Sequence, residues 1–193
     1  MILRTVVLFS FLGFWMNTQA QSFQVGFSQA KRQLVPDSNQ VIHLKNEPFK
    51  IEVKLDHLDG VFVNCSPDTM IWSGAQNRSI PEFETIGSKV TVETEFNQDQ
   101  ELFINYQDNY CYWFYDPKNY DWHRFDQELI VKGKTILATK TISKLFDTQE
   151  KENKALTRQQ TPLYLTFFSI TGSFSKEDAK LDQVKTFVLI FED

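Results

Sequence analysis

The chain has 193 residues, of which 41% are hydrophobic and 23% charged, and its formal net charge at pH 7 is −5. A chain of this length can bury a sizeable core within one domain. The acidic balance argues against a nucleic-acid partner, because a phosphate backbone selects a basic surface.

The first twenty residues have the three parts of a secretory signal peptide. Arg4 and the α-amino group supply a positive start, and an apolar stretch follows that ends at Met16. Thr18 and Ala20 then place small residues at positions −3 and −1 of a cut after Ala20. The alternative, a membrane anchor, needs about 18–20 apolar residues, which is more than this stretch offers. The sequence therefore predicts a signal peptide over residues 1–20, export to the periplasm or the extracellular space, and no membrane span after cleavage.

Alternation of apolar and charged residues with a period of two dominates the rest of the chain. Residues 49–56 alternate Phe, Ile, Val and Leu with Lys, Glu, Lys and Asp. This pattern is typical of an antiparallel strand with one buried and one wet face. Residues 60–65 alternate again, with Val61, Val63 and Cys65 on one face. Turn-forming residues between the two segments, including Gly60, predict a β-hairpin.

Further strands are predicted at short intervals. They cover residues 41–45, 89–96, 101–106, 110–115, 128–132, 134–142, 163–170 and 184–191. Because residues 163–170 and 187–191 are apolar on both faces, we expect them to lie centrally or beneath a covering loop. Many short strands with polar turns indicate an all-β fold with little helix. We expect an antiparallel β-sandwich, immunoglobulin-like or jelly-roll-like, with nine to eleven strands in a single domain over residues 21–193.

Two polar stretches interrupt the strand pattern. Residues 147–160 are rich in helix formers and end before Pro162, which predicts a short surface helix or a long loop. Residues 175–181 begin with Ser175 and have Asp178 three residues later, similar to a capping box, which is compatible with a helical turn. Both stretches are interpreted as solvated connections.

The two cysteines, Cys65 and Cys111, are expected to meet an oxidising compartment after export. An even number in that setting predicts one disulfide between them. The chain-entropy model gives such a bond roughly 4 kcal/mol of stabilisation. The alternative is a pair of buried free thiols. Neither cysteine has a neighbouring ligand at zinc spacing, so no metal site is predicted at either.

Residues 106–125 hold nine aromatic side chains and five of the six tyrosines of the chain, although only 15% of all residues are aromatic. Strand alternation over residues 110–115 groups Cys111, Trp113 and Tyr115 on one face and Tyr110, Tyr112 and Phe114 on the other. The first group resembles the core of a sandwich, because a cysteine beside a tryptophan is common there. The second group then forms either another packed face or an exposed aromatic platform.

An exposed platform of this kind suits a sugar, whose apolar C–H faces stack on aromatic rings while polar neighbours bind its hydroxyls. The predicted ligand-binding residues are Tyr110, Tyr112, Asp116, Asn119, Tyr120, Asp121 and Trp122. The competing interpretation is that these aromatic side chains are core residues, since aromatics favour strands and bury large areas.

The sequence carries no signature of a catalytic or metal site. None of the three histidines, His43, His57 and His123, belongs to a zinc-protease motif, and no serine lies in a nucleophile elbow. The acidic residues near Asp116 do not have the spacing of an EF-hand loop. No catalytic residue, no metal and no cofactor is predicted.

The leading hypothesis is an exported, non-catalytic binding or interaction module with a glycan or protein partner. One rival is an exported carbohydrate-active hydrolase, which would need two carboxyl groups facing each other across a cleft. Another is a structural protein of the cell envelope without a small-molecule ligand. The oligomeric state stays open at this point.

Overall fold

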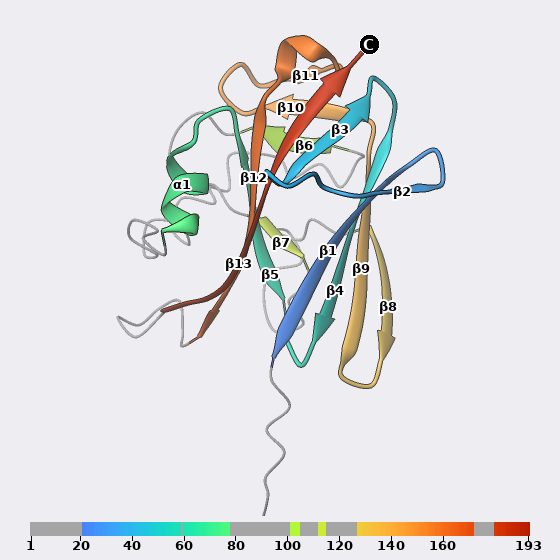
Figure 1. Ribbon diagram of the computed structural model, residues 1–193. Helices are drawn as coiled ribbons and strands as arrows, with labels where there is room; N and C mark the ends of the chain where they lie inside the picture. The colour runs from blue at the N-terminus through green and yellow to red at the C-terminus, as the bar shows by residue number, and fades with distance from the viewer. Residues whose placement is uncertain (1–20, 59, 78–100, 105–111, 115–126, 172–179) are drawn as a thin grey trace, which may run out of the picture.

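The computed structural model describes residues 21–58, 60–77, 101–104, 112–114, 127–171 and 180–193. Within these ranges the chain forms thirteen β-strands, one short α-helix and one 3-10 turn (Figure 1). The predicted all-β class with little helix is confirmed, with more strands than the nine to eleven expected. The predicted signal peptide, the predicted strand 89–96 and residues 175–179 of the predicted connection 175–181 lie outside the described residues. Residues 180 and 181 belong to the last strand, Lys180–Glu192.

The first sheet has five strands, all paired antiparallel, in the order β2-β1-β4-β9-β8. Its strands are β1 (Ser22–Gln29), β2 (Arg32–Leu34), β4 (Phe49–Asp56), β8 (Glu128–Lys132) and β9 (Thr135–Ile142). Alternation determines which face of this sheet is buried. Along β4 every second residue is buried, and the charged residues between them lie on the opposite face. The predicted strand 49–56 therefore has the predicted bounds and the predicted buried face.

The second sheet has the order β3-β13-β12-β5-β7. Its strands are β3 (Val41–Lys45), β5 (Val61–Ser66), β7 (Tyr112–Phe114), β12 (Leu163–Thr171) and β13 (Lys180–Glu192). All neighbours are antiparallel except β3 and β13, which run parallel. The two segments that are apolar on both faces lie in β12 and β13, in the interior of this sheet, as predicted.

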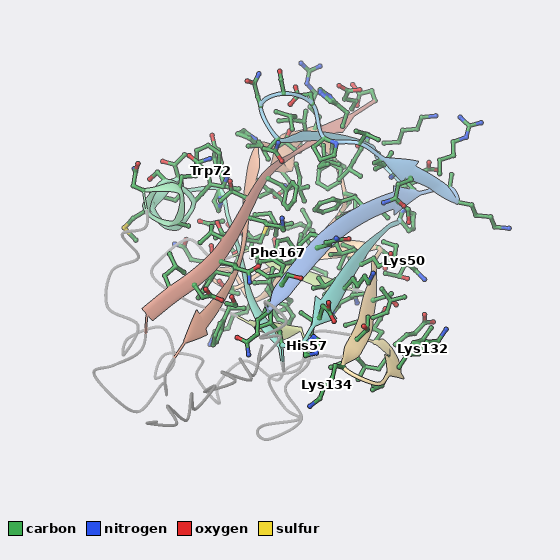
Figure 2. The ribbon with its side chains drawn as sticks, turned by 60° about the horizontal axis from the view of Figure 1, so that its bottom comes forward. Lys50, His57, Trp72, Lys132, Lys134 and Phe167 are labelled. Carbon is green, nitrogen blue, oxygen red and sulfur yellow. The ribbon has the colours of Figure 1, made fainter. Side chains whose placement is uncertain are left out.

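The two sheets share one cluster of buried apolar side chains. The Phe27 ring of β1 meets the Phe187 ring of β13 edge to face, with ring centroids 4.9 Å apart. Near the other end of β13, Phe191 approaches Phe49 of β4 at 6.1 Å. The cluster continues through both sheets and includes Phe167 of β12, which is fully buried (Figure 2). This arrangement is sandwich-like, as expected from the alternation of the strands.

Two glutamine side chains tie the first sheet to the second at opposite ends of β1. The Gln29 side chain donates to the carbonyl oxygens of Lys45 (3.0 Å) and Glu47 (2.8 Å), and its Oε1 accepts from the Lys45 N–H at 2.9 Å. At the other end, Gln183 of β13 donates to the carbonyl oxygen of Gln21 at 2.5 Å. These bonds satisfy backbone groups that no strand pairs.

A small sheet in the order β11-β10-β6 lies at the end of the molecule where the C-terminus emerges (Figure 1). Its strands are β6 (Glu101–Ile104), β10 (Lys144–Asp147) and β11 (Glu152–Lys154). The prediction of a helix or loop over residues 147–160 is therefore wrong in part, because this stretch contains β11 and the 3-10 turn Arg158–Gln160. Strands β10 and β11 form an antiparallel hairpin. Asp147 favours its turn locally, because the Asp147 carboxylate accepts from the N–H groups of Gln149 and Glu150.

The helix α1 (Met70–Gln76) packs beside the second sheet, where the Trp72 ring meets Tyr164 of β12 at 5.3 Å (Figure 2). Sequence reasoning missed it, since seven residues carry little helical periodicity. No helix in the described part of the chain has the length and apolar character to cross a bilayer.

The predicted hairpin between residues 49–56 and 60–65 is wrong. Strand β4 pairs with β1 and β9 in the first sheet, whereas β5 pairs with β12 and β7 in the second. The connection between them thus crosses from one sheet to the other. Burial gives the reason: β4 has one wet face, but all six residues of β5 are buried and need cover on both sides.

Candidate functional site

The predicted ligand-binding residues fall in the aromatic segment 106–125, of which the structure describes only the strand β7. Tyr112 is part of this strand. Six of the predicted residues lie outside the described residues, namely Tyr110, Asp116, Asn119, Tyr120, Asp121 and Trp122. The role of these residues therefore stays a prediction, and the structure describes the attachment of the segment.

The aromatic segment is attached to the rest of the fold through β5. Strand β7 is the last strand of the second sheet among the described strands, and it pairs with β5, which is buried along its whole length. The register sets Tyr112 across from Val63, Trp113 across from Phe62 and Phe114 across from Val61. Both valines belong to the core between the sheets. All three partners in β5 are buried, so the register does not separate the two predicted faces, and the sorting of the aromatic side chains stays a prediction.

The disulfide predicted between Cys65 and Cys111 is not formed, because Cys65 is a free thiol; Cys111 lies outside the described residues. Cys65 belongs to the buried core. In β5 it lies across from Leu165 of the interior strand β12. Burial raises the pKa of the Cys65 thiol, which keeps it protonated and unreactive.

A hollow of about 560 Å³ opens where β1, β2, β3 and the end of β13 come together. The Gln29 side chain, held by the Lys45 and Glu47 backbone, forms part of its wall. Its rim carries charges of both signs. The lining residues are Gln29, Ala30, Arg32, Leu34, His43, Leu44, Lys45, Glu47 and Glu192.

One histidine of this hollow has a carboxylate partner. His43 Nδ1 lies 2.6 Å from Glu192 Oε1, and both side chains are more than half exposed. Hydrolases use such a pair to orient a general base beside a nucleophile. Among the lining residues from the described part of the chain, none is a serine, threonine or cysteine.

Two charged side chains lie inside the fold where sequence reasoning did not expect them. Glu101 of β6 is 2% exposed, and its Oε1 lies 2.9 Å from Lys144 Nζ of β10. Lys140 of β9 is 1% exposed and occupies the inward positions of the strand together with Ile136, Ala138 and Ile142. The sequence contained a signal for the burial of Lys140, because this lysine stands in an alternating set of otherwise apolar residues. No comparable pattern in the sequence indicates the burial of Glu101.

We expect Cys65 to be inert in the native protein. In a Cys111→Ser variant, which leaves Cys65 as the single thiol, an aromatic disulfide reagent at pH 8 should react at least about a hundredfold more slowly than in 6 M guanidinium. The reason is that burial withholds the thiolate. Non-reducing peptide mapping of the parent gives the contrary outcome: recovery of Cys65 and Cys111 in one linked fragment would restore the predicted disulfide.

The Glu101–Lys144 pair should be far more important for stability than a surface pair. Lys144→Met leaves a buried carboxylate without its cation and should lower the free energy of unfolding by about 3 kcal/mol. The matched control is Lys50→Met, because the partner of Lys50, Glu128, is exposed; it should cost less than about 1 kcal/mol. Urea titrations followed by tryptophan fluorescence measure both. Equal losses in the two variants would contradict the assignment.

Two further sources of functional information are metal-binding clusters and similarity to known proteins. Over the ranges that the structure describes, no three His, Cys, Asp or Glu side chains come together as ligands for a metal ion. Comparison with known proteins finds no match to a family model, a curated protein or a solved structure. The function therefore has to be proposed from the chain itself.

Proposed function

We propose that this protein is an exported, non-catalytic binding module that holds a glycan with its aromatic segment 106–125. The segment combines nine aromatic side chains with the polar residues Asp116, Asn119 and Asp121. Aromatic faces stack on sugar rings, and amide and carboxylate groups bind the hydroxyls at their edges. A protein partner is the alternative ligand, since exposed tyrosine and tryptophan also dominate protein interfaces.

The observation that carries the proposal is the place of β7 in the second sheet. Among the described strands it is the outermost, beyond β5, whereas β12 and β13 occupy the interior. Segments that enter and leave an edge strand run along the border of a sheet, and binding residues are common on such connections. Attachment at an edge therefore supports a segment that a ligand can reach.

A carbohydrate-active hydrolase, the alternative, needs two carboxyl groups facing each other across a cleft. Glu47 and Glu192 both line the hollow beside β1, but Glu192 is paired with His43, and β3 and β7 lie at opposite borders of the second sheet, so these carboxylates are not beside the strand that carries the aromatic segment. Within the described ranges, no contact favours a purely structural envelope role.

Export is part of the proposal, and the position of β1 supports it. This strand begins at Ser22, directly after the predicted cleavage site, and the Gln21 carbonyl is already bound by Gln183. N-terminal sequencing of protein recovered outside the cytoplasm should therefore begin at Gln21. Recovery of the whole protein in the membrane fraction with Met1 retained would refute export by cleavage.

The glycan proposal is tested on Trp122. Trp122→Ala should weaken binding to a glycan identified on an array by about 1–3 kcal/mol, as expected for an aromatic anchor. Its melting temperature should stay close to that of the parent, because an exposed ring contributes little to the core. The array screen and a thermal melt of both proteins are the measurements.

The matched control is Trp72→Ala, in the helix α1. The Trp72 ring packs on Tyr164, so this variant should lose stability while its folded fraction binds glycan like the parent. If Trp122→Ala instead melts like a core truncation, with a cost of about 3–5 kcal/mol, and the parent binds no glycan, the aromatic segment is core and the proposal is wrong.

A further inference from the structure

Strand β8 forms an exposed border of the first sheet. Among the described strands it pairs only with β9, and no strand lies on its outer side (Figure 1). Ile130 is 53% exposed and Val131 is 55% exposed, two of the four exposed large apolar side chains in the described part of the chain. At the other border, β2 has only three residues and is soon followed by Pro36, which cannot donate to a ladder. Exposed apolar edges tend to recruit another strand.

The turn between β8 and β9 determines which backbone groups face outward. Gly133 has φ of +62° and, with Lys134, forms a two-residue turn closed by Lys132 and Thr135. In a two-residue hairpin the closing residues are a hydrogen-bonded pair, and such pairs alternate along the ladder. Ile130 and Glu128 therefore direct their N–H and C=O groups to β9. Leu129 and Val131 direct theirs to the free edge.

The sequence of β8 is complementary to itself when read in the opposite direction. In an antiparallel pair of two β8 strands centred on Ile130, each Glu128 lies across from Lys132 of the other copy. Leu129 lies across from Val131, and the two Ile130 residues face each other. The hydrogen-bonded pairs of this register are those of Leu129 with Val131, which are the residues whose backbone groups are directed outward. Side-chain charge and backbone pattern thus select the same register.

We propose that two copies of this chain associate through β8, antiparallel and about a two-fold axis at Ile130, so that their first sheets become one continuous sheet. The charged ends of the strand fit this arrangement. Lys132 extends into solvent at the tip of the β8–β9 hairpin, and Glu128 is exposed although it also accepts from Thr139 and lies 3.7 Å from Lys50 (Figure 2). A second copy is the occupant because its edge supplies the matching charges in the matching order.

The interface is small, so the dimer is expected to be weak. Five residues on each side bury less than the roughly 1,200 Å² of a standard stable interface. Standard interfaces already extend to micromolar dissociation constants, so we expect about 10–100 µM for this smaller one. Light scattering or sedimentation of the purified parent should therefore show a monomer–dimer equilibrium in this concentration range. Lys132→Glu puts like charges across from each other and should raise the dissociation constant about fivefold at low salt, and less at 1 M NaCl.

Cysteine cross-linking tests the register. Facing residues of a non-hydrogen-bonded pair have Cα atoms about 4.5 Å apart, within disulfide range, so Ile130→Cys should cross-link to a covalent dimer under mild oxidation. Lys132→Cys is the matched control: it is equally accessible, but the two copies of this position lie about 13 Å apart along the strands and should not cross-link. The parent, with Cys65 and Cys111, gives the background.

The outcomes separate cleanly. A parent that dimerises, with cross-linking confined to Ile130→Cys, supports the proposal. A parent that stays monomeric at about 500 µM overturns it. Cross-linking in neither variant, or equally in both, also overturns it, because then the copies meet elsewhere or only by random collision. If Ile130→Cys fails to fold, the salt-dependent loss of affinity in Lys132→Glu decides the question instead.

Discussion

The structure depends on the burial of one apolar face of the first sheet against the second. Period-two alternation gives β4 one apolar face and one charged face. Exposure of the apolar face to water is unfavourable, so the sheet is stable only when a second layer covers that side. Strand β13, from the C-terminus, supplies much of that cover. Phe187 meets Phe27 and Phe191 approaches Phe49, so residues about 140 to 160 positions apart hold the layers together. Packing of this kind cannot be local.

Polar side chains add a second set of contacts between the strands and layers of the fold. At the two ends of β1, Gln29 and Gln183 reach across to the other layer and bind backbone groups there. The Glu101–Lys144 pair lies in the small sheet, where β6 and β10 run parallel. These contacts add less free energy than the core does. Loss of Lys144 would nevertheless be expensive, because the Glu101 carboxylate is held away from water.

The borders of the sheets are where this fold can meet other molecules. The interior strands have partners on both sides, and their backbone groups are used within the sheet. In our proposals, β7 carries the ligand-binding segment and β8 is the edge that pairs with a second copy. The two strands lie in different sheets, so the two proposals do not compete for one border.

The sequence by itself determined the strands with clear alternation. Residues 41–45, 49–56 and 128–132 have the predicted bounds, because the contrast between apolar and charged neighbours marks both ends of these strands. It also indicated an interior place for residues 163–170 of β12 and 187–191 of β13, since these stretches are apolar on both faces. It could not assign β4 and β5 to different sheets, because adjacent strands in sequence pair as hairpins by default and only long-range burial overrides that tendency. The same limit applies to the cysteines. Their number and expected compartment predicted a bond, whereas Cys65 is a free thiol in the buried core, and its place there is a property of the assembled sheets. Local pattern fixes which face of a strand is buried; which strand lies beside it is decided by the packing of the whole core.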